Sequence, residues 1–154
     1  MVFLYDNEKI SEKEIQTLYE NHPYLIEKKF LNQKIISQFP LPSGFADIVM
    51  LLKDETVIIE LKVDPLEVNH LLQLNGYLED IKKELKDDHR IRGILIGKEP
   101  KKDLNNILMC LSFEIKIMIL EKELCTKIKI CENCRLANDI NSISCIYCFN
   151  KSFF

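Results

Sequence analysis

Two apolar runs lie near the middle of the sequence, Phe45-Ala46-Asp47-Ile48-Val49-Met50-Leu51-Leu52 and Val57-Ile58-Ile59-Glu60-Leu61-Lys62-Val63. Asp54-Glu55 lies between them and predicts a turn, so the two runs are expected to pair as a hairpin. Because side chains alternate along a strand, Glu60 and Lys62 share one face and their neighbours share the other. Two carboxylates and a lysine are uncommon in strands that otherwise belong to a core. Asp47, Glu60 and Lys62 are therefore candidate functional residues.

These side chains suit a divalent cation and a phosphate ester, provided that Asp47 faces the same side as Glu60. Carboxylates supply the hard oxygen ligands that Mg²⁺ prefers. A bound ion can activate water and neutralise charge on a phosphoryl oxygen. A lysine can orient or deprotonate that water, or stabilise the developing charge. The simpler alternative is that Glu60 and Lys62 form an ordinary exposed pair on the polar face of an antiparallel sheet.

A helix is predicted directly after the hairpin, from about Leu66 to Leu85. Gln73 and Tyr77 are four residues apart and share one of its faces. Pro65 stands at the entry, where a helix tolerates proline. This helix favours the functional interpretation of the hairpin. Its core face consists of apolar residues at helical spacing, which are Leu71, Leu74, Leu78, Ile81 and Leu85.

A second helix start is predicted at Ser11-Glu12-Lys13-Glu14. Ser-x-x-Glu before an amphipathic run is typical of a capping box, in which Glu14 turns back onto the backbone of Ser11. Glu12 has no such capping role. Its purely structural interpretation is that an acid in the first turn interacts favourably with the helix dipole.

Together these segments resemble the PD-(D/E)XK nuclease superfamily, and most closely the catalytic domain of the NucS mismatch-endonuclease type. The resemblance covers roughly residues 11 to 120. Asp with Glu-x-Lys alone occurs by chance, but the combination with the two helices is fairly specific. The matching residues are Ser11-Glu12-Lys13-Glu14-Ile15, Asn21-His22-Pro23-Tyr24-Leu25-Ile26-Glu27, Gly44-Phe45-Ala46-Asp47-Ile48, Val57-Ile58-Ile59-Glu60-Leu61-Lys62, and Gln73-Leu74 with Tyr77.

The resemblance implies a restriction-endonuclease-like core and a metal-dependent DNA endonuclease of DNA repair. Such an enzyme is a magnesium- or manganese-dependent deoxyribonuclease that hydrolyses phosphodiester bonds. The alternative function is a non-catalytic nucleic-acid-binding module built on the same sheet, and the intact set of acids and lysine favours the enzyme. The implied roles are Glu12, Asp47 and Glu60 as ligands of Mg²⁺ or Mn²⁺, Lys62 as the group that positions the attacking water, Gln73 as the group that orients the metal shell or the scissile phosphate, and Tyr77 as its support.

NucS-type enzymes carry a further amino-terminal domain for DNA binding and dimerisation. Here the matching helix begins near residue 11, so we expect that domain to be missing and mismatch specificity not to transfer. The expected partners are DNA together with a second copy of the chain or a separate targeting protein.

The tail contains two Cys-x-x-Cys pairs, Cys131-Glu132-Asn133-Cys134 and Cys145-Ile146-Tyr147-Cys148, separated by ten residues. This spacing predicts a compact zinc ribbon, in which four thiolates close a structural, tetrahedral site. A tail of about thirty residues is too small to bury an adequate core without such a staple. Two disulfides are the rival interpretation. Because no signal peptide is evident, we expect a cytoplasmic, reducing setting that favours zinc.

Composition agrees with one ordinary domain and an appendage. The chain has 154 residues, of which 47% are hydrophobic, and a formal net charge of −3. No apolar run approaches a membrane span. The negative charge argues against a globally basic nucleic-acid binder but is compatible with an acidic metal pocket that has a local basic rim. Candidate rim residues are Lys28, Lys29, Lys34, Lys98, Lys101, Lys102, Lys127, Lys129 and Arg135.

The expected fold is α/β, a mixed central sheet flanked by helices with a small carboxy-terminal zinc ribbon. Cys110 is expected in the core. We place the nuclease-like domain at residues 1–122 and the ribbon at 123–154. The expected elements are a helix over 11–30, strands near 34–41, 45–53 and 56–63, the Gln73 helix, a strand over 91–97, a helix from Pro100 to about Leu111, and a strand over 114–120.

Overall fold

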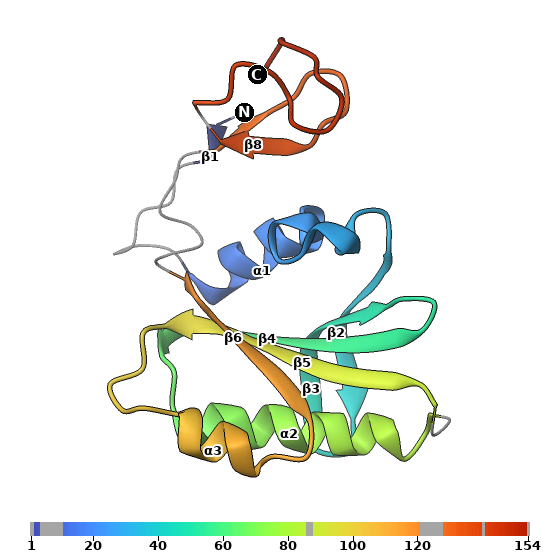
Figure 1. Ribbon diagram of the computed structural model, residues 1–154, viewed down its shortest axis with the longest axis vertical. Helices are drawn as coiled ribbons and strands as arrows, with labels where there is room; N and C mark the ends of the chain where they lie inside the picture. The colour runs from blue at the N-terminus through green and yellow to red at the C-terminus, as the bar shows by residue number, and fades with distance from the viewer. Residues whose placement is uncertain (1, 4–10, 86–87, 121–127, 140, 154) are drawn as a thin grey trace. The chain divides into compact units, whose positions relative to one another are not determined.

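The computed structural model describes residues 2–3, 11–85, 88–120, 128–139 and 141–153 (Figure 1). They form two compact units, one of residues 11–120 and one that contains residues 2–3 with those from 128 onward. The first unit contains α1 (Glu12–Asn21), the 3₁₀ turns η1 (Pro23–Leu25) and η2 (Lys28–Phe30), β2 (Lys34–Leu41), β3 (Gly44–Leu51), β4 (Glu55–Pro65), α2 (Val68–Lys82), β5 (Arg90–Lys98), α3 (Asn105–Cys110) and β6 (Glu114–Ile119). The second contains β1 (Val2–Phe3), β7 (Ile128–Ile130) and β8 (Ala137–Asp139).

The first unit is built on a five-stranded sheet of order β2-β3-β4-β5-β6. The β2–β3 and β3–β4 pairs are antiparallel, whereas β4–β5 and β5–β6 are parallel. Parallel neighbours need crossover connections, and α2 and α3 lie in these two connections. The predicted mixed sheet flanked by helices is therefore confirmed.

Helices cover both faces of this sheet. In Figure 1, α2 and α3 lie on one face and α1 on the other. The α2 side holds a continuous apolar core that includes Leu71, Leu74 and Leu78, all fully buried. The α1 side buries Ile15 and Tyr19. Among the described residues, no helix is long and apolar enough to cross a membrane.

The first helix is shorter than predicted. It ends at Asn21 rather than near residue 30, because Pro23 disfavours the helical conformation of the residue before it and His22 turns away with φ −133° and ψ 61°. The chain continues through η1 and η2, which seat Tyr24 and Phe30 in the core.

The hairpin turn is one residue earlier than predicted. Glu55 was expected in the turn, but its carbonyl accepts the N–H of Leu52 at 2.9 Å and its side chain is buried in β4. The carboxylate accepts from Arg92 Nε at 3.1 Å and lies 2.6 Å from Lys29 Nζ. Arg90 Nη1 lies 3.5 Å from the same carboxylate. Burial alone would raise the pKa of Glu55, but its contacts with Arg92 and Lys29 outweigh burial and lower the pKa to about 2.

The core position expected for Cys110 is wrong, since this residue is exposed at the end of α3. The helix has only six residues. Ile107 and Leu108 supply its packing against the core, and Cys110 falls outside that face.

The second unit has a three-stranded antiparallel sheet of order β1-β7-β8. Val2 pairs with Lys129, and Ile130 pairs with Ala137. The strand Val2–Phe3 thus belongs to the unit that carries the cysteine pairs, whereas the expected nuclease-like domain of residues 1–122 included it.

Candidate active site and metal centre

The side chains of Asp47 and Glu60 bridge β3 and β4 at the point where the backbone pairing of these two strands ends. The recorded pairs stop at Ile48 with Ile59. Beyond them, the Asp47 N–H donates to Glu60 Oε1 at 3.0 Å, and the Leu61 N–H donates to Asp47 Oδ2 at 2.9 Å. The two carboxylates therefore take the place of backbone acceptors, and both side chains are largely buried. Each carboxylate has a second oxygen that these bonds do not use.

Lys62 lies beside this pair. Its Nζ is 3.9 Å from Glu60 Oε2, and 21% of its side chain is exposed, against 2% for Glu60. Burial, followed by repulsion from the Asp47 carboxylate, raises the pKa of Glu60 to about 8, against the lowering effect of Lys62. The cluster thus carries more negative potential than one lysine neutralises, and this favours a cation.

Glu12 approaches the same cluster from the start of α1. Burial raises its pKa; Lys62 opposes this, and the carboxylates of Asp47 and Asp64 add to it. Its neighbour Glu14 is occupied elsewhere. The predicted capping box is present, with the Ser11 N–H donating to Glu14 Oε2 at 2.9 Å and the Glu14 N–H donating to Ser11 Oγ at 3.2 Å.

Tyr77 and Gln73 reach the cluster from α2. Gln73 Nε2 donates to Tyr77 Oη at 3.0 Å. Burial raises the pKa of the Tyr77 hydroxyl, and the negative charge of Glu60 raises it further. Gly44, at φ +144°, starts β3 against this ring, and a Cβ there would lie 2.9 Å from Tyr77 Oη. Glycine at this position is what lets the hydroxyl sit beside the start of β3.

Sequence reasoning missed two glutamines that surround Asp47. Gln38 Nε2 lies 3.4 Å from Asp47 Oδ1 and 3.2 Å from Gln16 Oε1. Gln16 Nε2 donates to the Asp47 carbonyl at 3.3 Å. The position of Gln16, four residues after Glu12 on one helix face, is a signal that could have found it. Gln38 has φ 49°, which no sequence pattern here indicates.

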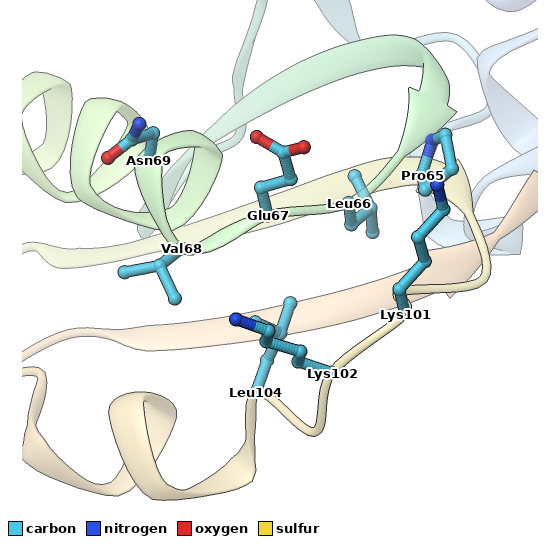
Figure 2. Close-up of a pocket in the computed structure, with 8 residues that line it drawn as sticks. All are labelled: Pro65, Leu66, Glu67, Val68, Asn69, Lys101, Lys102 and Leu104. Atoms are coloured by element: carbon cyan, nitrogen blue, oxygen red, sulfur yellow. The ribbon is translucent and has the colours of Figure 1, made fainter.

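A pocket of about 310 Å³ lies between the start of α2 and the segment after β5. Figure 2 shows Lys101 and Lys102 along the wall opposite the start of α2, with Leu66 and Leu104 among the apolar lining residues. Pro65, the last residue of β4, also lines it and follows Lys62 by three positions. Of the candidate basic rim, these two lysines therefore line a pocket with the last residue of the strand that carries Lys62, whereas Lys29 pairs with Glu55 at the turn end of β4.

The four cysteines of the tail converge in the second unit. All four sulfurs of Cys131, Cys134, Cys145 and Cys148 lie within 4.8 Å of one another. The Cys131–Cys148 and Cys134–Cys145 sulfur distances are 3.6 and 3.5 Å. Zinc–sulfur bonds of about 2.3 Å in a tetrahedron separate sulfurs by about 3.8 Å, whereas a disulfide requires about 2.05 Å. The cluster therefore fits a metal ion and not two disulfides.

Each cysteine pair forms the same kind of turn. The Arg135 N–H donates to the Cys131 carbonyl at 3.0 Å, and the Phe149 N–H donates to the Cys145 carbonyl at 2.9 Å. Both Arg135 and Phe149 are left-handed, with φ of 66° and 62°. We call these two turns the knuckles.

Amide groups surround the sulfurs. Asn138 Nδ2 lies 3.4 Å from Cys145 Sγ, and Asn150 Nδ2 lies 3.9 Å from Cys131 Sγ. Burial raises the pKa of Cys145, but backbone N–H bonds from Cys148 and Tyr147 outweigh it and bring the pKa to about 6. These donors favour the thiolate, which is the form that binds metal.

The carboxylates are more widely spread than the cysteines. Among the residues that the structure describes, the cysteines are the only group of three or more potential ligands whose atoms lie within 4.8 Å of one another. Asp47 and Glu60 are joined through the strand backbone, and Glu12 is close enough to interact electrostatically. Their arrangement can hold an ion only with a shift of side chains or with water among the ligands.

Comparison with known proteins defines first a fold class and then a family. Solved nuclease structures share the fold of the sheet unit. Residues 11–134 match the endonuclease NucS C-terminal domain, and the chain belongs to that family.

Three solved structures give the extent of the likeness. A repair endonuclease from Pyrococcus abyssi is 25% identical, with a TM-score of 0.58 over 76% of this chain and 50% of that one. A complex of EndoMS with double-stranded DNA is 23% identical, with a TM-score of 0.57 over 75% and 48%. EndoMS in its apo form is 25% identical, with a TM-score of 0.54 over 72% and 47%. The chain thus spans about half the length of each. No protein of curated function matches the sequence.

Proposed function

We propose that this chain is a metal-dependent DNA endonuclease, a magnesium- or manganese-dependent deoxyribonuclease that acts in DNA repair. The observation that carries the proposal is the pair Asp47 and Glu60, fixed through each other's strand backbone with Lys62 at 3.9 Å. Membership of the NucS C-terminal family and the shared fold support it.

In this proposal, Glu12, Asp47 and Glu60 hold Mg²⁺ or Mn²⁺. The causes of the raised pKa of Glu60 support this, because a divalent cation would offset both its burial and its repulsion from the Asp47 carboxylate. When bound, such an ion supplies an activated water and neutralises charge on the phosphoryl group. The glutamines around Asp47 keep its carboxylate in position.

Hydrolysis forms one P–O bond to water and breaks one P–O bond to a sugar oxygen. Lys62 positions the attacking water, and its ammonium group stabilises the charge that develops on the phosphate. Gln73 orients the ion's shell or the scissile phosphate, and Tyr77 fixes the amide of Gln73 through their hydrogen bond at 3.0 Å. Lys101 and Lys102 contact the DNA backbone beside the site.

For the second unit we propose a structural Zn²⁺ on the four cysteines, because four sulfurs fill a tetrahedral shell and leave no position for substrate. A division between residues 122 and 123 remains our proposal for the carboxy-terminal boundary of the nuclease-like domain, while β1 belongs to the second unit. We further propose a cytoplasmic setting, in which the thiols stay reduced, and a second copy of the chain or a targeting protein as partner.

Plasmid nicking with added Mn²⁺ tests the catalytic proposal. Wild-type protein should nick, and Asp47→Asn and Glu60→Gln should not, because each loses a charge that holds the cation. Asp54→Asn makes the same chemical change in the hairpin turn and is the matched control. Nicking by Asp47→Asn at the wild-type rate, or nicking that needs no divalent ion, would contradict the site assignment.

A non-catalytic DNA-binding module is the second candidate. The wider spacing of the carboxylates than of the cysteines favours it. Metal-independent DNA binding without nicking, in a protein whose Asp47→Asn variant binds DNA equally well, would select this function.

A further inference from the structure

The two knuckles place bulky residues where the backbone favours glycine. Arg135 and Phe149 each directly follow the second cysteine of a pair, and both have left-handed φ values. Side chains with a Cβ are disfavoured in this region, and only glycine enters it without cost. Equivalent positions in the two knuckles are therefore occupied by a cation and an aromatic ring at a conformational cost.

Both of these side chains reach solvent. Arg135 is exposed, and Phe149 is 76% exposed. Ile146, in the same knuckle as Phe149, is 55% exposed. The phenyl ring of Phe149 is exposed to water, and its backbone has an unfavourable conformation, so the residue costs free energy in two ways. Strained positions and exposed apolar surface concentrate at binding sites.

We propose that the knuckles bind unpaired bases of single-stranded DNA. A base stacks on the ring of Phe149, with Ile146 extending the apolar surface, and Arg135 contacts the adjoining phosphate. Each of the two residues directly follows a cysteine, and the sulfurs of those cysteines lie within 4.8 Å of each other. This inference deepens the proposed function by naming the state of the DNA that the cysteine-bearing unit takes.

The charge of this unit favours stacking over general attraction to phosphate. Between residues 128 and 153 the cations are Lys129, Arg135 and Lys151, and the carboxylates are Glu132 and Asp139. So balanced a surface gives a shallow salt dependence. Base–aromatic stacking needs a base that is free of the duplex, since every unpaired base offers a π-face. A single strand therefore fits this surface better than a duplex.

The test measures binding of labelled twelve-residue oligothymidylate and of an abasic strand of equal length and charge. It uses the full-length Asp47→Asn chain with zinc bound and no added Mg²⁺ or Mn²⁺, so it does not depend on cleavage. We expect the thymidine strand to bind about ten times more tightly than the abasic strand. Phe149→Gly should remove this preference and yet raise the temperature at which zinc is released, because it relieves the strain. Arg135→Gly should weaken binding to both strands equally and also raise that temperature.

Two further variants guard against a folding failure. Phe149→Leu keeps the strain and the apolar bulk but lacks the flat ring, and it should lose the preference for thymidine. Ile143→Ala removes a side chain that is 85% exposed in the same unit and should leave the preference unchanged. Equal affinity of the wild-type chain for both strands, or an unchanged preference in Phe149→Gly, would overturn the proposal. Absence of plasmid nicking would refute the nuclease and leave this binding result standing.

Discussion

The acidic cluster and the cysteine centre both bring side chains that can carry like charges close together. They differ in what holds those side chains in place. Asp47 and Glu60 are fixed by backbone N–H groups and by the packed sheet around them, so their positions exist before any ion arrives. The described part of the cysteine unit buries few apolar side chains, among them Ile130 and Ala137, so we expect the proposed Zn²⁺ to supply much of its order. We therefore expect the acidic cluster to serve chemistry and the cysteine centre to serve folding.

The largest expected effect comes from removing the Zn²⁺ that we propose for the second unit. Cys145→Ser should unfold residues from 128 onward and leave the sheet intact, because structural zinc contributes about 10–16 kcal/mol to folding. Elemental analysis and the dispersion of amide NMR signals measure both effects. Cys110→Ser, at an exposed cysteine outside the cluster, is the control and should change neither. A Cys145→Ser variant that is free of zinc and still folded from residue 128 onward would contradict the expectation that this unit needs a metal ion to fold.

The second largest effect concerns Lys62. Lys62→Ala should slow cleavage by about a hundredfold or more if the ammonium acts on the water or on developing charge. It should leave Mn²⁺ binding largely intact and cost about 0–1 kcal/mol of stability. Single-turnover kinetics at saturating metal decide the matter. An unaltered rate would reduce Glu60 and Lys62 to a structural pair.

Two substitutions of Asp47 distinguish its proposed role in metal binding from its role as an acceptor for the backbone of β4. Asp47→Asn keeps an acceptor for the Leu61 N–H and should lose Mn²⁺ binding without loss of stability. Asp47→Ala leaves that N–H without its acceptor and should cost about 1–3 kcal/mol, partly offset by relief of repulsion with Glu60. Calorimetric titration of Mn²⁺ and urea unfolding measure the two terms. If both variants were equally stable, the hydrogen bond from the Leu61 N–H to the Asp47 side chain would not contribute to the stability of the fold.

Two carboxylates of β4 should make the free energy of unfolding depend on pH in opposite ways. The pKa of Glu60 is raised from 4.5 to about 8 in the metal-free fold. Its contribution to stability is therefore fully present below pH 4.5 and is lost as the pH rises through 8. The pKa of Glu55 is lowered to about 2, so its contribution is present above pH 4.5 and is lost as the pH falls toward 2. Urea unfolding between pH 5 and 8 should show the first trend, and Glu60→Gln should flatten it. Persistence of the trend in Glu60→Gln would assign it to another group.

The smallest effect concerns the pocket lysines. Lys101→Ala with Lys102→Ala should weaken DNA binding and reduce the slope of log affinity against log salt by about 2, which is nearly one counterion per lost phosphate contact. Lys34→Ala with Lys53→Ala removes equal charge at the turn end of the hairpin, where Lys34 pairs with Leu51, and should change the slope less. Equal slopes for the two double variants would remove the pocket from the proposed DNA path.

Residue pattern was enough to predict the mixed sheet, the hairpin, the capping box and the convergence of the cysteines. These features depend on local periodicity and spacing. The positions of Glu55 and Gln38 depend on partners far along the chain, since Arg92 holds the first and the second contacts Asp47 from a left-handed backbone. An acidic residue beside a turn is usually exposed, and Glu55 is buried because cations distant in the sequence pair with it.

The pairing of β1 with β7 sets an order of events during synthesis. Val2–Phe3 leaves the ribosome before residues 11–120, whereas its partner Ile128–Ile130 emerges after them. The large sheet has all its strands in one continuous segment and can form while the tail is still being made. The small sheet can form only after residues 11–120 have been made, because its strands lie on both sides of them in the sequence.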